Sequence, residues 1–317
     1  WEPTEHGWEG KRRSLLNERR SEQLASIVEL EQQNPLTITS NEVSDDLEKW
    51  LSRQALQEGK RLENLMNQLW KGINWKKNHR VLVLTPSSLL WSLKPLREVS
   101  EGGVILAVSD DIHPRLLAEL EFLDPLERPL LIDSKVESIK KLQDNLKFEV
   151  IGGRIPWKIF SKTNFSEMWP IITEKCTLNA ELSLIISTPC SGPALSIKES
   201  LNVSSNNEKT DFSLLGDLIL KEDRWLNKQD QKDKFIRQLE KLGWNISSEE
   251  WTEVVHQKVD RSVIERWLHE GSEYRQIILK SYKEETLAPL KELFKKLEGV
   301  TIKQKLIHTK LLAKFNN

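Results

Sequence analysis

Six polar residues come at or directly after the ends of four short apolar runs in the first half of the chain. They are Thr85, Ser87, Asp110, Asp111, Asp133 and Arg154. If the runs are parallel strands of one sheet, their carboxyl ends meet at one edge, where open α/β sheets bind their ligands. A carboxylate after the second strand can accept hydrogen bonds from ribose hydroxyls. We therefore take these six residues as the candidate ligand-binding set.

Side chains that hold metals or act as nucleophiles occur without the spacing that such chemistry needs. The six histidines are scattered, and Cys176 and Cys190 form no C-x-x-C pair, so the sequence predicts no metal site. Ser191-Gly192 lacks the G-x-S-x-G turn of hydrolases. Asp111 and His113 could form half of an acid–base pair, although a surface histidine at a helix start is the more common outcome. The sequence thus identifies no catalytic residue.

Apolar runs alternate with helical segments from Arg80 onward. The runs are Val81–Leu84, Gly103–Val108, Pro129–Ile132, Phe148–Ile151 and Leu182–Ile186. Each interval is long enough for one crossover helix, and runs that are apolar on both faces are typical of strands buried between helices. This pattern predicts β-α units that form a mostly parallel sheet.

The last third of the chain contains two amphipathic helical stripes that end at Gly243 and Gly299, which are favourable residues after a helix. Trp244–Ile246 resumes an extended run, and we expect Thr301–Phe315 to be a closing strand. Seven lysines against two glutamates over residues 288–317 give a local charge of +5. Such a charge usually marks a solvated face, and contact with phosphate or DNA is the alternative.

Residues 1–75 contain no strand-like run. Apolar residues recur at helical spacing, most clearly between Leu47 and Trp70, and Ser44 is placed to cap that helix. We therefore expect a helical tail and linker over residues 1–75 and a single α/β domain over residues 76–317.

The composition limits the class of protein. There are 47 basic and 48 acidic side chains, so the net charge of −1 gives no general attraction for nucleic acid. No apolar stretch approaches the ~18 residues of a membrane span, and two cysteines do not make a disulfide scaffold. We expect a cytoplasmic protein with no membrane partner. The chain starts at Trp1 and has no signal-peptide pattern, which favours a piece cut from a longer polypeptide.

The first eleven residues have a specific order of aromatic, Pro-Thr, glycine and charged residues. Trp1–Lys11 reads WEPTEHGWEGK, which resembles the aromatic-x-Pro-Thr-x-x-Gly-x-Glu-x-Lys tail of the replication-associated recombination AAA+ ATPases. In some bacteria, cyanobacteria among them, that ATPase is fused to a methyltransferase-like domain, and residues 75–317 are similar to this appended part. The similar segments are Arg80–Leu84, Glu101–Val104, Phe148–Arg154 and Leu242–Trp244.

This resemblance implies that AAA+ ATPase modules lie upstream in the same polypeptide and are its first partners. It also makes DNA or replication-fork proteins candidate partners. No G-x-x-x-x-G-K-[ST] motif occurs in the 317 residues, so this fragment should not hydrolyse ATP.

The order of elements independently suggests a class I methyltransferase-like Rossmann fold of three layers, preceded by an N-terminal helical segment. In such a fold S-adenosylmethionine binds at the carboxyl ends of the strands, beside a glycine-rich turn and an acidic residue. Asp110 or Asp111 stands at the acidic position, and Asp133 lies near the expected adenine. Each of these aspartates could instead cap the following helix.

The turn after the first strand departs from the cofactor-binding pattern. Residues 85–91 read TPSSLLW and contain no glycine. Side chains of Pro86 and Leu89 would occupy space that the methionine part of the cofactor needs, and the hydroxyls of Thr85, Ser87 and Ser88 are suited to capping the next helix.

The segment after the fourth strand departs as well. Amino-methylating enzymes carry Asn/Asp-Pro-Pro-aromatic here, and only Pro156-Trp157 fits that motif. Arg154 or Ile155 replaces the residue whose carbonyl would accept from the target amine.

These observations favour a degenerate methyltransferase-like domain that acts as a binding or interaction module within an ATPase fusion. The alternative is an active S-adenosylmethionine-dependent methyltransferase acting on DNA, RNA or a repair protein. The first loop distinguishes the two, because a pocket beside residues 85–88 favours the enzyme and side chains that fill it favour the module.

Overall fold

The computed structural model describes residues 59–316 apart from residues 122, 144, 157–162, 203–208, 227–228, 271, 281, 283 and 297. The Trp1–Lys11 segment, the proposed Ser44 cap and Trp157 therefore lie outside the described residues. Residues 59–70 are helical, and the second half of the stripe that predicted this helix is buried, with Leu62, Leu69 and Trp70 at most 1% exposed.

Seven strands form one sheet in the order β3-β2-β1-β4-β5-β7-β6. They are β1 (Arg80–Leu84), β2 (Gly103–Val108), β3 (Leu130–Asp133), β4 (Phe148–Pro156), β5 (Cys176–Pro189), β6 (Trp244–Lys258) and β7 (Thr301–Phe315). The pairs β1–β2, β1–β4 and β2–β3 are parallel, whereas β7 runs antiparallel to both β5 and β6. The mostly parallel sheet of an α/β fold, predicted from the sequence, is confirmed.

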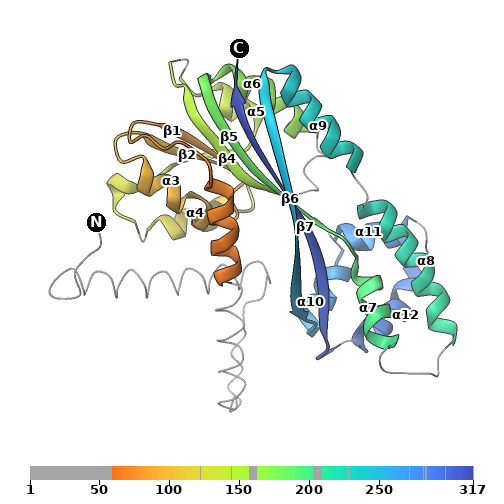
Figure 1. Cartoon of the computed structure of the whole chain (residues 1–317). Coiled ribbons are helices and arrows are strands. Elements are labelled where there is room, and N and C mark those ends of the chain that lie inside the picture. The colour runs from red at the N-terminus through yellow and green to blue at the C-terminus, as the bar shows by residue number, and fades with distance from the viewer. Residues whose placement is uncertain are drawn as a thin grey trace. The chain divides into compact units, whose positions relative to one another are not determined.

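Helices connect and cover these strands (Figure 1). They are η1 (Leu89–Ser92), α3 (Leu93–Glu98), α4 (His113–Leu120), η2 (Pro125–Glu127), α5 (Val136–Lys140), α6 (Thr163–Glu174), α7 (Pro193–Asn202), α8 (Lys209–Leu226), α9 (Gln229–Lys241), α10 (Arg261–Leu268), α11 (Glu273–Leu279), η4 (Glu284–Thr286) and α12 (Leu287–Lys295). The described residues divide into two compact units, one within residues 59–134 and 148–153 and the other within residues 135–147 and 154–316.

The core of the first unit forms around β1, because this strand has neighbours on both sides in the sheet. Residues Val81 to Leu84 are fully buried, which explains their continuous apolar run. The helix over residues 59–70 is joined to the segment after β1 by a buried hydrogen bond, in which the Trp70 indole Nε1 donates to the carbonyl of Trp91 at 2.9 Å. A buried indole N–H needs such an acceptor.

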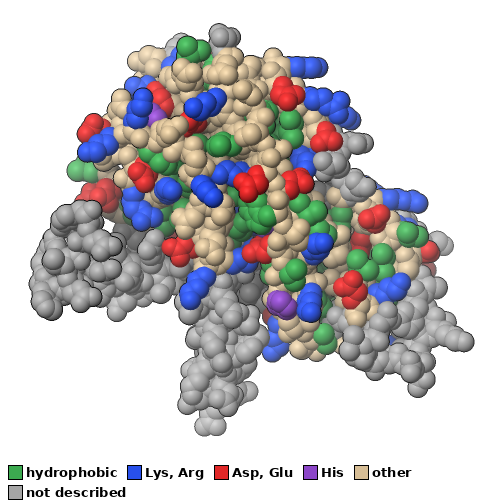
Figure 2. Space-filling model, in the orientation of Figure 1, with side chains coloured by type: hydrophobic (Ala, Val, Ile, Leu, Met, Phe, Trp, Pro, Cys, Tyr) green, Lys and Arg blue, Asp and Glu red, His purple; other side chains and the backbone are tan. Residues whose placement is uncertain are grey.

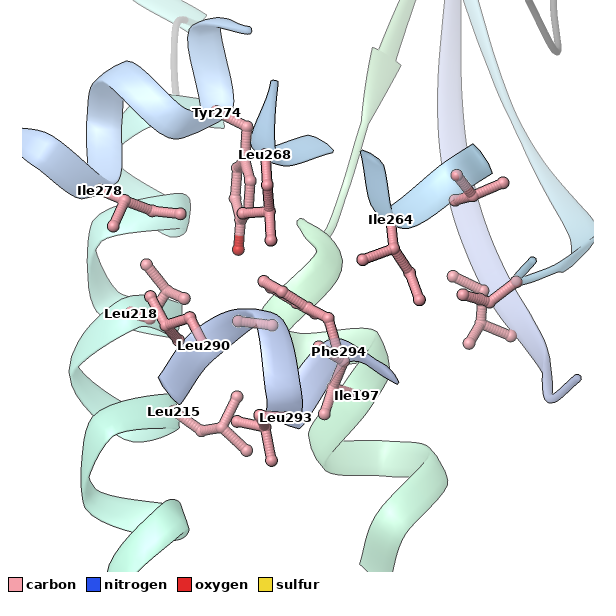
Figure 3. Packing of buried hydrophobic residues seen from close by; sticks show 14 residues of the cluster. Ile197, Leu215, Leu218, Ile264, Leu268, Tyr274, Ile278, Leu290, Leu293 and Phe294 are labelled. Atoms are coloured by element: carbon pink, nitrogen blue, oxygen red, sulfur yellow. The ribbon is translucent and has the colours of Figure 1, made fainter. Parts of the chain in front are cut away.

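The second unit has a separate apolar core among its last helices. Figure 3 shows side chains from α7, α8, α10, α11 and α12 pointing toward one another, with the Phe294 ring among them. Residues Ile197, Leu218, Ile278 and Phe294 in this cluster are fully buried. Burying side chains of this size stabilises the fold by about 1.5–3 kcal/mol each, so this cluster holds the last helices of the second unit together.

Strands β6 and β7 form a long antiparallel ribbon within the second unit (Figure 1). They pair along their full length, from Trp244 opposite Phe315 to Lys258 opposite Thr301. Helices α7, α8, α10, α11 and α12 gather around the end of the ribbon where β6 ends and β7 begins. One end of the ribbon therefore pairs with β5, and the other end lies against this helical cluster.

Acidic and basic side chains are interspersed over the face of the molecule in view in Figure 2. This distribution matches the near balance of charges in the sequence. Among the residues described, no helix combines the length and the apolar character that crossing a bilayer requires.

Candidate functional site

The turn after β1 adopts a backbone conformation that glycine favours, with a threonine in that place. Thr85 has a φ of 46°, in the left-handed region that is strained for a β-branched residue. Its N–H donates to the carbonyl of Ala107 on β2 at 2.9 Å, which holds the turn against the neighbouring strand. The chain thus makes the sharp turn expected at a ligand-binding edge without a glycine.

The rest of the first loop is filled by its own side chains. Leu89, Leu90 and Trp91 are between 1% and 4% exposed. The hydroxyl of Ser87 accepts a 3.1 Å hydrogen bond from the Trp91 indole Nε1. The Ser87 side chain therefore serves to hold a buried tryptophan of the same loop.

The interpretation of the loop hydroxyls as caps of the next helix is wrong for Ser88. Ser88 is the residue before η1, yet its side chain makes no capping hydrogen bond. The Ser88 hydroxyl is 1% exposed and has no hydrogen-bond partner in the described part of the chain. An unpaired buried hydroxyl is unfavourable, so the fold tolerates a cost at this position.

The cap comes instead from α4. The Glu119 Oε2 atom accepts a 2.9 Å hydrogen bond from the N–H of Leu89, the first residue of η1. A carboxylate is favourable at the start of a helical turn because the N–H groups there have no partner within the helix. The backbone N–H of Leu89 thus already donates its hydrogen bond to a carboxylate of the protein itself.

Arg115 compensates the charge of this carboxylate. Its Nη2 atom lies 3.1 Å from Glu119 Oε1, one helical turn away on the same face of α4. The two atoms are not aligned as a hydrogen bond, so the contact is an ion pair. Burial raises the pKa of the Glu119 carboxyl, and the Leu89 amide and Arg115 oppose that rise. Burial also lowers the pKa of Arg115.

The predicted aspartates lie at the carboxyl ends of β2 and β3. Asp133 is the last residue of β3, opposite Val108 at the end of β2. Asp110 and Asp111 follow β2 and are exposed. Neither is the N-cap of α4, since that position is taken by Ile112, where no side chain caps the helix. The structure therefore places Thr85, Ser87 and the three aspartates along the same edge of three adjacent strands.

The residues of this edge do not fit S-adenosylmethionine well. The acidic position after β2 is occupied by exposed carboxylates that could face ribose hydroxyls. The turn after β1, however, is closed by buried Leu89, Leu90 and Trp91, and the Leu89 amide is engaged by Glu119. A cofactor that needs close approach to this backbone meets side chains instead.

Gly153 on β4 allows close contact with β1. A Cβ atom at this position would lie 2.4 Å from the carbonyl oxygen of Leu84. The glycine therefore serves the packing of two strands rather than the approach of a ligand.

Arg154, the sixth predicted residue, belongs to the second compact unit and has a different neighbour. Its Nε atom lies 3.4 Å from the Ser187 hydroxyl on β5. Ser187 in turn lies 2.9 Å from Nδ1 of His308 on β7, and His308 Nε2 lies 2.9 Å from Glu253 Oε2 on β6.

Sequence reasoning missed this second group of polar residues because it treated the histidines as scattered. Ser187 and His308 are 121 positions apart and meet only through the antiparallel pairing of β5 with β7. A prediction of that strand register could have found them. In the described part of the chain, no group of three or more His, Cys, Asp or Glu side chains is arranged to hold a metal.

No protein-family model matches the sequence, and no curated protein matches it either. The fold is similar to a putative methyltransferase from Bacillus halodurans, with 13% identity, a TM-score of 0.43 and coverage of 81% of this chain and 100% of that one. It is also similar to the YcgJ protein from Bacillus subtilis, with 12% identity, a TM-score of 0.47 and coverage of 81% and 99%.

A third similar structure is a phosphoethanolamine N-methyltransferase 2 from Haemonchus contortus, solved with phosphomonomethylethanolamine and S-adenosylhomocysteine. Its identity is 11%, its TM-score is 0.37, and the match covers 81% of this chain and 52% of that one. The strand order and the parallel β1–β4 core give this protein a class I methyltransferase-like Rossmann fold.

Proposed function

We propose that this chain is a methyltransferase-like domain that has lost the binding of S-adenosylmethionine and acts as a binding or interaction module. The observation that carries the proposal is the contact of the Glu119 carboxylate with the Leu89 amide. This contact occupies the first turn after β1, where the cofactor would need the backbone to be free.

The filling of the loop supports the same conclusion. Pro86 and Ser88 are buried together with Leu89 to Trp91. Opening a site here would expose apolar surface to water and would leave the Trp91 indole without its Ser87 acceptor. The loop is therefore stable in its closed form.

The biological setting is part of the proposal. The order of residues in Trp1–Lys11 supports placement downstream of a replication-associated recombination AAA+ ATPase. On this proposal the domain binds ATPase modules of the same polypeptide, DNA or replication-fork proteins. The test is co-purification of the ATPase part with residues 59–317 supplied as a separate chain, after the separate chain has been shown to fold by circular dichroism.

Isothermal titration with S-adenosylmethionine and S-adenosylhomocysteine tests the loss of cofactor binding. The proposal predicts no binding heat at cofactor concentrations up to the millimolar range, which corresponds to about −4 kcal/mol of binding free energy. A saturable curve with 1:1 stoichiometry would overturn it.

The second candidate is an active S-adenosylmethionine-dependent methyltransferase, favoured by one observation. Asp110 and Asp111 remain exposed directly after β2, and neither is the N-cap residue of α4. For this candidate, the titration should show binding of S-adenosylmethionine. The double substitution Asp110→Asn and Asp111→Asn should weaken that binding. The module proposal predicts no difference between that variant and the original chain.

A further inference from the structure

We propose that Ser187 is a nucleophilic hydroxyl, activated by His308 and Glu253, that accepts acyl groups from esters. The three side chains form a continuous line of hydrogen-bond contacts on β5, β7 and β6. All three belong to one compact unit and share no residue with the loop after β1.

The two contacts of His308 have the geometry of an oriented base. Ser187 Oγ lies 2.9 Å from Nδ1, and Glu253 Oε2 lies 2.9 Å from Nε2. An ionised carboxylate only accepts hydrogen bonds, so the ring proton belongs on Nε2 and the Nδ1 lone pair faces the serine. A hydroxyl within reach of a base that a third group orients is the pattern of an activated nucleophile.

The strand register holds this arrangement in place. Ser187 and Trp251 are both directly opposite His308, on either side of β7. The Trp251 ring centre lies 5.3 Å from that of His308 and restricts its movement. Sites built on strands keep their geometry better than sites on loops, so the serine and the base are preorganised.

Burial decides which hydroxyl the base can act on. The His308 side chain has no exposed surface, whereas Glu253 is 25% exposed and Ser187 is partly exposed. Both ring nitrogens already face a protein partner. In the free protein the proton that His308 can take is therefore that of Ser187. Once Ser187 is acylated its hydrogen bond to Nδ1 is lost, and Nδ1 can then exchange a proton with the leaving alcohol and with water.

Arg154 supplies a positive charge beside the reacting oxygen. Its Nε atom is 3.4 Å from Ser187 Oγ, the same atom that contacts His308 Nδ1. A fixed cation near a developing oxyanion stabilises the transition state of acyl transfer. This favours esters whose carbonyl oxygen can approach the Arg154 guanidinium.

The proposed reaction balances in two halves. Ser187 Oγ bonds to the acyl carbon while its proton moves to His308 Nδ1, and the ester C–O bond breaks as the leaving alcohol takes that proton. Water then attacks the acyl-serine, gives a proton to His308 Nδ1, and releases the carboxylic acid as the Ser187 hydroxyl is restored. No oxidant, reductant or metal is required.

The test is labelling of the full chain with an alkyl fluorophosphonate, which phosphonylates an activated serine with loss of fluoride. Peptide mapping by mass spectrometry should find the adduct on Ser187 in the original protein and none there in Ser187→Ala. Replacement of the base in His308→Gln should slow labelling by at least ~10²-fold.

Because His308 is buried, its replacement could prevent folding, and a second variant at a more exposed position avoids that difficulty. Glu253→Gln should slow labelling by between ~10-fold and ~10⁴-fold, since it removes the negative charge that fixes the ring tautomer and stabilises the protonated ring. Ser247→Ala is the matched control, because Ser247 is an exposed serine on β6 that bonds a backbone carbonyl. Its labelling rate should equal that of the original protein.

Two results would overturn the inference. One is the absence of an adduct on Ser187 in the folded original protein. The other is an adduct on Ser187 that forms in folded Glu253→Gln as fast as in the original chain, because the hydroxyl would then react without its oriented base.

Discussion

The Glu119 carboxylate on α4 accepts a 2.9 Å hydrogen bond from the N–H of Leu89, 30 positions earlier in the chain. This contact completes the first turn of η1, which the preceding Ser88 hydroxyl does not cap. At the edge of the sheet where this fold class binds its ligand, the Leu89 amide is thus engaged by a group of the protein itself. The proposal that this domain is a binding module depends on that contact.

Removal of the Glu119 carboxylate should destabilise the protein. Glu119→Ala leaves the Leu89 amide and the Arg115 guanidinium without their partner, so we expect a loss of about 1–3 kcal/mol in the free energy of unfolding. Glu119→Gln retains a carbonyl acceptor and should lose less. Urea unfolding measures both, with the exposed Glu121→Gln on the same segment as the control. Equal midpoints for Glu119→Ala and Glu121→Gln would contradict the role assigned to this carboxylate.

Glu222 should make stability depend on pH. It is 1% exposed on α8, and its carboxylate accepts from the N–H of Ala194 at 2.7 Å and from the Tyr274 hydroxyl. Burial raises its pKa to about 7, although these hydrogen bonds act in the opposite direction.

The sign of this dependence follows from the raised pKa. Between about pH 4.5 and pH 7 the folded state holds the Glu222 proton and the unfolded state does not, so stability falls as pH rises. The stabilisation that the folded state gains by holding the Glu222 proton is fully present below about pH 4.5. By the time the pH is above 7, the free energy of unfolding has fallen by about 3 kcal/mol. Glu222→Gln cannot titrate and should flatten this part of the curve. Parallel stability–pH curves for the two proteins would contradict the prediction.

Two glycines of the second unit should respond in opposite ways to alanine. A Cβ atom at Gly192 would lie 2.3 Å from the Glu222 carboxyl carbon, so Gly192→Ala must displace that side chain and should cost about 1–3 kcal/mol. Gly216 lies within α8 and has nothing within 4 Å of an added Cβ. Gly216→Ala should stabilise by up to ~1 kcal/mol through helix propensity. Thermal unfolding distinguishes them, and a shift of the same sign in both would count against this packing.

The contact between β1 and β4 gives a similar pair in the first unit. Gly153→Ala would place a Cβ atom 2.4 Å from the Leu84 carbonyl oxygen, which is backbone and cannot rotate away. We expect a loss of about 1–3 kcal/mol. Gly103→Ala at the start of β2 meets nothing within 4 Å and should change stability by less than ~0.5 kcal/mol. If Gly153→Ala unfolds at the same urea concentration as Gly103→Ala, the strands do not pack as described.

The sequence predicted the positions of the strands better than their ends. Gly103–Val108 and Thr301–Phe315 have the predicted limits. Strand β4 continues past Ile151 to Pro156, because Gly152, Gly153 and Arg154 interrupt the apolar run without ending the extended backbone. Hydrophobic pattern alone cannot detect such an extension.

Strand β6 extends twelve residues beyond the predicted run at Trp244–Ile246. Most of that extension is polar, and its residues are extended because each pairs with β7 as far as Lys258. Backbone pairing of this kind depends on a partner strand that lies more than 40 positions away in the sequence, so local propensity does not reveal it.

In the candidate site, too, local features could be predicted from the sequence and tertiary contacts could not. The polar residues after β1, β2 and β3 could be predicted because they follow apolar runs directly. The partners that define their surroundings could not, because Glu119 reaches Leu89 from a helix and His308 reaches Ser187 from an antiparallel strand. Tertiary packing decides both contacts.

A crystal of this protein soaked with S-adenosylhomocysteine tests the central claim most directly. The account predicts no ligand density beside Thr85 to Ser88 and an intact hydrogen bond between Glu119 and the Leu89 amide. Clear density for the nucleoside at the carboxyl ends of β1 and β2, with the Glu119 carboxylate displaced from Leu89, would contradict it.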